Sequence, residues 1–129
     1  MMGPFIFLGT YSIKPGKLEE ARKGLAKLVD FVETNEPRLI AFHCFLNDEG
    51  TKLTIHQLHP DAASMEFHMQ VNAKHFATAF DYLDAQISEQ YYGPMSDALA
   101  AELSKWDEPG LETTRMPVHE GGFTRTNVR

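Results

Sequence analysis

The stretch that decides the fold runs from Leu53 to Phe76 and reads LTIHQLHPDAASMEFHMQVNAKHF. It starts with the alternation of a half-buried strand, which Pro60 ends because proline has no backbone N–H to donate. A helix is expected to begin at Asp61 and another after Asn72, since Asp and Asn commonly precede a first helical turn. Four of the six histidines of the chain fall in this stretch. The sequence therefore predicts a strand that passes directly into a helical layer carrying imidazoles, which are candidates for ligand contact.

The composition limits the classes of partner. The chain has 129 residues, with 12 basic and 18 acidic side chains and a formal net charge of -6, whereas nucleic-acid binding needs clustered Lys and Arg. The same charge argues against anionic membrane surfaces, and no apolar stretch is long enough to span a bilayer. The single cysteine, Cys44, allows neither an intrachain disulfide nor a cysteine-based metal site. We expect one domain, residues 1–129, in the cytoplasm, with no nucleic acid and no membrane as partner.

Upstream of the opening stretch, the pattern predicts a strand and a helix. Residues 5–13 are rich in aromatic and β-branched side chains and predict a first strand that is apolar on both faces at its start. A turn at residues 14–17 precedes residues 18–32, where apolar side chains recur at helical spacing. Pro37 disfavours helix immediately before it, so we expect the helix to end near Asn35.

A hairpin is expected to connect this helix to the opening stretch. Residues 39–47 predict a second strand, and Asn, Asp and Gly at residues 47–50 supply the turn that leads into a third strand at residues 52–59. If the hairpin is symmetric about Glu49, His43 and Gln57 lie on the same face. A buried polar group needs a partner, so the two side chains either pair with each other or jointly orient a ligand.

The predicted strands carry apolar residues on both faces, which has a consequence for assembly. A sheet buried on both sides needs two coverings, and the helices of one monomer supply only one of them. The simplest second covering is another copy of the same sheet. The sequence therefore predicts a homodimer formed through the sheet faces.

Downstream, helical patterns dominate. A short helix from Asp61 carries Met65 and Met69, and a longer helix from Asn72 is expected because one apolar stripe contains Ala73, Phe76, Ala77, Phe80, Leu83 and Ile87. Gly93-Pro94 interrupts that pattern, and an added helix is predicted at about residues 94–106. One more strand is expected near residues 113–118. The C-terminal strand and tail comprise residues 111–129, and we expect Thr113 to Arg129 to extend across the partner subunit.

The order strand, helix, strand, strand, helix, strand is the ferredoxin-like split βαβ arrangement, an α+β fold with a four-stranded antiparallel sheet and two main helices. Six short signatures follow in this order along the chain: Lys14-Pro15-Gly16-Lys17, Glu36-Pro37, Ile55-His56-Gln57-Leu58, Asp61-Ala62-Ala63, His68 and His75-Phe76. Together they resemble the antibiotic biosynthesis monooxygenase family, over about residues 5–83. The resemblance implies a dimeric α/β barrel in which two ferredoxin-like subunits pack sheet against sheet.

The family resemblance also suggests an activity. Its members include cofactor-independent oxygenases of quinols and aromatic polyketides, as well as haem-degrading enzymes. The haem-degrading branch resembles a site of Asn, Trp and His, but the only tryptophan here, Trp106, lies outside the matched region, so that branch is disfavoured. This chain also has Gln57-Leu58 where the family usually has Glu-Tyr or Glu-Trp, and His68 is farther from His75 than usual. The resemblance implies a cofactor-independent monooxygenase acting on a small aromatic or quinol-like substrate, with no cofactor.

The candidate site residues follow from the same signatures. His75 and His68 match histidines of the family and are the candidate catalytic residues, either of which can take a proton from a phenolic substrate. His75 lies about 100 degrees round the helix from Phe76 and is expected at the pocket rim. Alternatively, His75 is an exposed helix histidine and His68 only supports the helix break. The candidate substrate-binding residues are His43, Gln57, Phe76 and Met65.

Two alternatives to this activity stay open. One is a non-catalytic dimeric barrel that binds an apolar small molecule, and the other is a structural dimer with no ligand. A metal site is disfavoured because His56 and His59, three apart on a strand, point to opposite faces and no carboxylate completes a triad. The observation that separates the alternatives is whether the pocket between the sheet and the second helix is open and lined by convergent polar groups.

Overall fold

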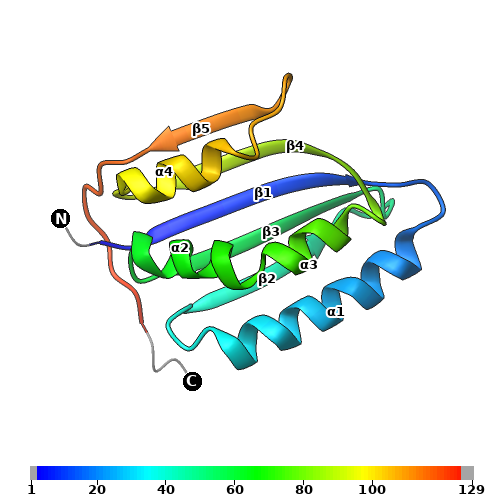
Figure 1. Ribbon diagram of the computed structural model, residues 1–129, viewed down its shortest axis with the longest axis horizontal. Coiled ribbons are helices and arrows are strands. Elements are labelled where there is room, and N and C mark those ends of the chain that lie inside the picture. Colours follow the sequence, from blue (N-terminus) through cyan, green and yellow to red (C-terminus); the bar gives the residue numbers. More distant parts are fainter. Residues whose placement is uncertain (1–2, 126–129) are drawn as a thin grey trace.

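The structure, a computed structural model that describes residues 3–125, consists of one sheet and one layer of helices (Figure 1). The elements follow in the order β1 (Phe5–Ile13), α1 (Leu18–Asn35), β2 (Ala41–Leu46), β3 (Lys52–His59), α2 (Ala62–Val71), α3 (Ala73–Ala79), β4 (Leu83–Tyr92), α4 (Asp97–Ser104) and β5 (Glu112–Met116). The first strand, first helix, hairpin and added helix therefore lie where the sequence predicts them, and the fold is ferredoxin-like α+β.

The sheet has five strands in the order β2-β3-β1-β4-β5. Neighbouring strands are antiparallel except for β4 and β5, which are parallel. A parallel pair needs a crossover connection, and α4 provides it. In the register of the central strands, Gly9 of β1 lies opposite Ile55 on one side and opposite Glu89 on the other. The middle of β1 is therefore the centre of the sheet.

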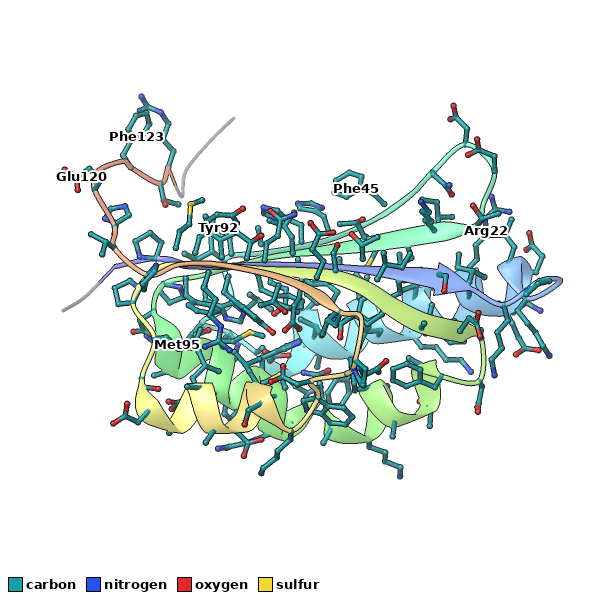
Figure 2. The ribbon with its side chains drawn as sticks, turned by 90° about the horizontal axis from the view of Figure 1, so that it is seen from above. Arg22, Phe45, Tyr92, Met95, Glu120 and Phe123 are labelled. Carbon is teal, nitrogen blue, oxygen red and sulfur yellow. The ribbon has the colours of Figure 1, made fainter. Side chains whose placement is uncertain are left out.

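All helices cover the same face of the sheet (Figures 1 and 2). We call this the inner face and the other the outer face. Burial alternates strictly along β1: Phe5, Phe7 and Tyr11 are buried on the inner face, and the alternate residues that point to the other face are only partly covered. This period of two is what a strand covered on one face requires. The core therefore lies between the inner face and the helices.

Two buried clusters fill that layer. One surrounds Tyr11 and Leu53 and joins α1 and α3 to the sheet, and the other surrounds Phe5 and Tyr91 and joins α2 and α4 to it. The cap of α2 is Asp61, whose carboxylate accepts a hydrogen bond from the backbone N–H of Ser64 at 3.0 Å, as a helix N-terminus favours. These contacts place α2, with its histidine, directly over the end of β3.

One predicted element is wrong. The long helix expected from Asn72 to Ile87 is instead α3, which ends at Ala79, a turn, and the strand β4. Apolar residues three or four apart can also share one face of a strand when a bulge inserts an extra residue between them. The pairing of β4 with β1 contains such register shifts, so the spacing is compatible with both structures. Pairing with the otherwise unsatisfied edge of β1 outweighs helix propensity in this segment.

The prediction of a four-stranded antiparallel sheet is also wrong, because residues 83–92 form a strand that was expected to be helix. The fourth strand of the ferredoxin-like order is β4, while the strand predicted near residues 113–118 is a fifth strand, β5. It pairs with β4 of its own chain. The predicted extension of Thr113 to Arg129 across a partner subunit stays a prediction; residues 117–125 are exposed and residues 126–129 lie outside the described part.

The hairpin register also differs from the symmetric one. Phe42 lies opposite Gln57, and His43 lies opposite His56. Since opposite residues share a face, Gln57 and Phe42 belong to the inner face while His43 belongs to the outer face. His43 is exposed, so the predicted pair of His43 and Gln57 does not form.

The outer face carries no helix among residues 3–125, and Phe45 and Tyr92 project from it (Figure 2). Phe45 is 60% exposed. Among the described helices, none is long and apolar enough to cross a membrane.

Candidate functional site

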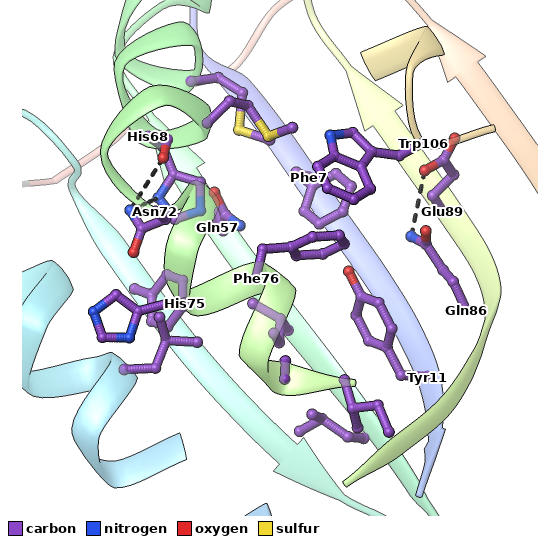
Figure 3. A pocket seen from close by; sticks show the side chains of 18 of the residues that line it. Phe7, Tyr11, Gln57, His68, Asn72, His75, Phe76, Gln86, Glu89 and Trp106 are labelled. Carbon is purple, nitrogen blue, oxygen red and sulfur yellow. Dashed lines mark hydrogen bonds between the residues drawn. The ribbon is translucent and has the colours of Figure 1, made fainter. Parts of the chain in front are cut away.

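A pocket lies between the inner face of the sheet and the helices (Figure 3). The cavity is small, with a volume of about 70 Å³. Its apolar lining includes Phe7, Phe42, Met65, Phe76, Leu103 and Trp106, and its polar lining consists of Gln57, His68, Asn72, His75, Gln86 and Glu89, with the hydroxyls of Tyr11, Tyr82 and Tyr91. A mainly apolar cavity with a few convergent polar groups is typical of a small-molecule site.

The most connected polar group in the site is His68 of α2, which is 7% exposed. Its Nδ1 lies 2.8 Å and 3.0 Å from the two carboxylate oxygens of Glu36, a residue that is 4% exposed at the end of α1. Asn72, one turn after His68, donates from Nδ2 to the same carboxylate at 2.5 Å and to the carbonyl oxygen of His68 at 3.1 Å. Glu36 is therefore a buried carboxylate held by two donors from the helical layer.

This arrangement assigns the tautomer of His68. Because a carboxylate only accepts hydrogen bonds, the proton of the neutral ring belongs on Nδ1 and the lone pair on Nε2. Nε2 has no hydrogen-bond partner among the described residues. The Oδ1 of Asn72 is buried and also has no partner within that part of the chain. In Figure 3 this oxygen points away from His68, toward the side of His75. The site thus holds a free base, and beside it a buried acceptor that no described residue satisfies.

A second polar chain supports the same end of the pocket. His59, at the end of β3, is fully buried; its Nε2 lies 2.8 Å from Gln57 Oε1 and its Nδ1 lies 2.7 Å from Ser64 Oγ. Burial, and then the nearby His68, lowers the pKa of His59 to about 3, so its ring is neutral. Since Gln57 lines the pocket, His59 fixes the orientation of its amide.

The structure brings together five of the six predicted site residues. His68, His75, Gln57, Phe76 and Met65 all line the pocket. His75 is half-buried and packs on Phe31 of α1, with ring centroids 4.3 Å apart, as expected for a rim position. His43 lies on the outer face and takes no part in the site.

Several polar residues of the site were not predicted from the sequence. Glu36 was noted only in the Glu36-Pro37 signature. The local sequence does not show that its carboxylate is buried, because its partner His68 lies 32 residues away. Gln86 and Glu89 were missed because their segment was predicted to be helical up to Ile87. Trp106 lines the pocket from the end of α4 and contacts Phe76, with ring centroids 4.4 Å apart.

The lining does not suggest a metal centre. Within residues 3–125, no cluster of three or more His, Cys, Asp or Glu side chains is arranged to hold a metal ion. The chemistry that the site can perform with its own groups is proton transfer and hydrogen bonding to an apolar molecule.

Comparison with known proteins supports the fold. No family model matches the sequence and no curated protein matches it. Among solved structures, MupZ from Pseudomonas fluorescens superposes with a TM-score of 0.74 at 20% identity, over 97% of this chain and 91% of that chain. A likeness over 97% of the chain must include α4 and β5.

Shorter likenesses involve proteins whose names describe them as putative antibiotic biosynthesis monooxygenases. One, from Caulobacter crescentus, has a TM-score of 0.63 at 18% identity, over 70% of this chain and 88% of that chain. Another, from Bacteroides thetaiotaomicron, has a TM-score of 0.58 at 20% identity, over 65% of this chain and 83% of that chain. These likenesses, together with the order of elements, show that the chain has the fold of the antibiotic biosynthesis monooxygenases.

Proposed function

We propose that the protein is a cofactor-independent monooxygenase that acts on a small aromatic, quinol-like substrate. The observation that carries the proposal is the Glu36–His68 pair, which leaves His68 Nε2 unpartnered at a mainly apolar pocket. A histidine whose other nitrogen is held by a carboxylate is the usual arrangement of a general base. The fold shared with antibiotic biosynthesis monooxygenases supports the same reaction class.

In the proposed reaction, His68 takes the proton of a phenolic hydroxyl, and the electron pair stays on the substrate. The electron-rich phenolate then supplies electrons to molecular oxygen. One oxygen atom enters the substrate in place of two hydrogens, and the other leaves as water with those hydrogens. Both the electrons and the protons thus come from the substrate.

The test is oxygen uptake with a panel of quinols in air. His68→Ala is expected to reduce the rate by about a hundredfold or more, the usual contribution of a general base. Glu36→Gln keeps the shape but replaces the carboxylate, and is expected to reduce kcat with little change in KM. Lys27→Ala, an exposed change on α1 and away from the outer face, is the control and should retain the wild-type rate.

His75 remains the second candidate for the base. It lies at the rim of the same pocket but has no side-chain hydrogen-bond partner among the described residues to fix its ring. A large loss in His75→Ala together with a normal rate in His68→Ala would move the proton transfer to the rim. A normal rate in both variants would contradict histidine base catalysis.

The mainly apolar lining favours a second candidate, a non-catalytic protein that binds an apolar small molecule. Trp106 is the only tryptophan of the chain and lines the pocket, so its fluorescence reports occupancy. Quenching of Trp106 by quinols without any oxygen uptake would support this candidate. If the protein is only a structural dimer without ligand, we expect neither quenching of Trp106 nor oxygen uptake.

We also propose that the active form is a homodimer in the cytoplasm. The apolar outer face supports the dimer, because monomeric proteins rarely leave such a face open to water. The single cysteine, which has no intrachain partner, suits a reducing compartment.

A further inference from the structure

A tyrosine hydroxyl on the central strand of the sheet opens into the pocket. Tyr11 of β1 is only 3% exposed and lines the pocket on the inner face. Figure 3 shows its hydroxyl oxygen pointing toward the ring of Phe76, on the side of that ring remote from His68. The proposed proton transfer to His68 does not use Tyr11.

The hydroxyl of Tyr11 has no hydrogen-bond partner among the described residues. The carboxylate of Glu89 is close enough for its charge to act on Tyr11, but it accepts its hydrogen bonds from Gln86 and Thr113, at 3.3 Å each. In the described part of the chain, Asn72 Oδ1 is the one buried side-chain oxygen or nitrogen that is both shielded from solvent and unpartnered. The Tyr11 hydroxyl is therefore not shielded, and a molecule in the pocket can reach it.

The protonation of this hydroxyl is not in question near neutral pH. A tyrosine in water loses its proton only near pH 10. Burial, and then the negative charge of Glu89, raises the pKa of Tyr11 further. Tyr11 is therefore a hydrogen-bond donor without an acceptor in the described protein, and a buried donor of this kind needs an explanation such as a bound molecule.

The space for the hydroxyl comes from Gly9, two residues earlier on the same face of β1. A Cβ at Gly9 would lie 3.0 Å from the hydroxyl oxygen of Tyr11 and 2.7 Å from the ring of Phe7. A side chain at this position would displace both rings. The glycine thus lets Tyr11 lean back along β1, from its own position opposite Leu53 toward the level of Ile55.

The sheet fixes where the hydroxyl lies relative to His68. The ring of His68 is 5.9 Å from that of Phe42, which is opposite Gln57, so His68 lies over β2 and β3 at the level of Gln57. The Tyr11 hydroxyl lies over β1 beside Gly9, one strand away and two residues further along. Two residues span about 7 Å and neighbouring strands are about 5 Å apart, so the two groups are roughly 9 Å apart when projected on the sheet.

A single aromatic ring with oxygens at its two para positions spans such a gap, since a hydrogen bond of about 3 Å extends its reach at each end. The small volume of the cavity, about 70 Å³, favours one ring over fused rings. The side chains of Phe7, Phe76 and Trp106 provide apolar contacts for that ring.

We propose that Tyr11 binds the substrate by donating a hydrogen bond to an oxygen para to the hydroxyl that His68 deprotonates. The inference rests on the proposed function, whose substrate class it narrows to single-ring phenols with a 4-hydroxyl or 4-alkoxy group. The tyrosine holds the remote oxygen and so keeps the reacting hydroxyl at His68 Nε2. Tyr11 retains its own proton throughout.

Two phenols that differ in one group test the proposal without any oxygenation. 4-Methoxyphenol has an oxygen para to its hydroxyl, and 4-ethylphenol has a methylene group in the same place. Quenching of Trp106, the only tryptophan, measures the Kd of each. We expect the wild type to bind 4-methoxyphenol about tenfold more tightly, because 4-ethylphenol leaves the buried hydroxyl of Tyr11 without a partner.

Tyr11→Phe removes the hydroxyl and keeps the ring, so it should bring the ratio of the two Kd values to about one. Its urea denaturation midpoint should equal or exceed that of the wild type, since no partner within the protein is lost. Tyr82→Phe removes another hydroxyl that lines the pocket, but this one leans on Gly24 of α1, so the wild-type ratio should persist. Lys27→Ala, an exposed change on α1, is the control and should behave as the wild type.

Equal Kd values in the wild type, an unchanged ratio in Tyr11→Phe, or no binding of either phenol would overturn the inference. So would a ratio lost in Tyr82→Phe instead. A clear loss of stability in Tyr11→Phe would assign the hydroxyl to a partner within the protein and overturn it as well. A preference for 4-methoxyphenol without oxygen uptake from any quinol would refute the oxygenase but not the role of Tyr11 in binding. Oxygen uptake without the preference would do the reverse.

Discussion

Among single residues, His59 is the one whose burial has the clearest energetic consequence. Both of its ring nitrogens are hydrogen bonded, to Gln57 and Ser64, and the ring is fully buried. The folded protein therefore holds it neutral, while the unfolded chain protonates it as an ordinary histidine. The stability of the fold must depend on pH through this residue.

The expected pH dependence follows from the two pKa values of His59. The pKa falls from 6.5 to about 3 on folding, so between these pH values the unfolded state binds more protons. The free energy of unfolding should therefore decrease as pH falls below 6.5, by up to about 1.4 kcal/mol per pH unit from this residue. Urea denaturation of the wild type at pH 7 and pH 5 measures it.

The comparison with His59→Gln isolates this effect from other groups. The variant should be less stable at pH 7, because Ser64 or Gln57 loses its partner, by roughly 1–3 kcal/mol. Its difference from the wild type should shrink toward pH 5. His119→Gln, an exposed change, is the control. A difference that stays constant between pH 7 and pH 5 would mean that His59 does not titrate as described.

At the scale of elements, α2 is the one that connects stability to the site. It carries His68 and Met65 over the pocket, and its N-terminus is held by Asp61. The Asp61 carboxylate accepts from the backbone N–H of Ser64 and from Arg38, and the hydrogen bond from Arg38 is the main cause of its lowered pKa. A loose start of α2 would loosen both His59, through Ser64, and His68.

We expect Asp61→Ala to reduce the free energy of unfolding by about 1 kcal/mol, the usual contribution of an N-cap side chain. Asp61→Asn keeps a capping oxygen and loses the exposed ion pair with Arg38, so it should cost only a few tenths of a kcal/mol. Thermal or urea denaturation of the three proteins side by side measures both. Equal losses in Ala and Asn variants would assign the effect to the ion pair instead.

At the scale of the whole molecule, one face of the sheet remains to be covered. The helices bury the inner face, whereas Phe45 on the outer face is 60% exposed in the isolated chain. Cross-strand neighbours on that face include Ile6 with Leu58 and Leu8 with His56, so its apolar character extends over the central strands. A second copy placed face to face would bury all of them.

Light scattering at micromolar concentration should therefore show a dimer. Phe45→Glu should shift it to monomer, because a charge buried between two sheets is costly. Phe67→Glu is the matched control, since Phe67 is 45% exposed but lies on α2, on the helical side, and should leave the dimer intact. A wild-type monomer, or dissociation by Phe67→Glu rather than Phe45→Glu, would contradict a dimer through the outer face.

Much of the fold was accessible from the sequence because its signals are local. Alternation along β1, the apolar stripe of α1 and the turn chemistry of the hairpin each lie within one element. The stop at Pro60 and the restart at Asp61 place the His68 helix correctly for the same reason. Five of the six predicted site residues line the pocket, and His43 does not because its face depends on the hairpin register.

The amino-acid sequence by itself determined the elements that a local pattern defines and the apolar character of both sheet faces. Only the tertiary structure decided that residues 83–92 form a strand, because the edge of β1 provides hydrogen bonds that the segment cannot find alone. It also decided the chemistry of the site. Glu36 and His68, 32 residues apart, meet only when α1 and α2 pack on the same face of the sheet. Glu89 faces the pocket only because β4 pairs with β1 in the observed register, and such contacts between distant segments leave no periodicity in the sequence.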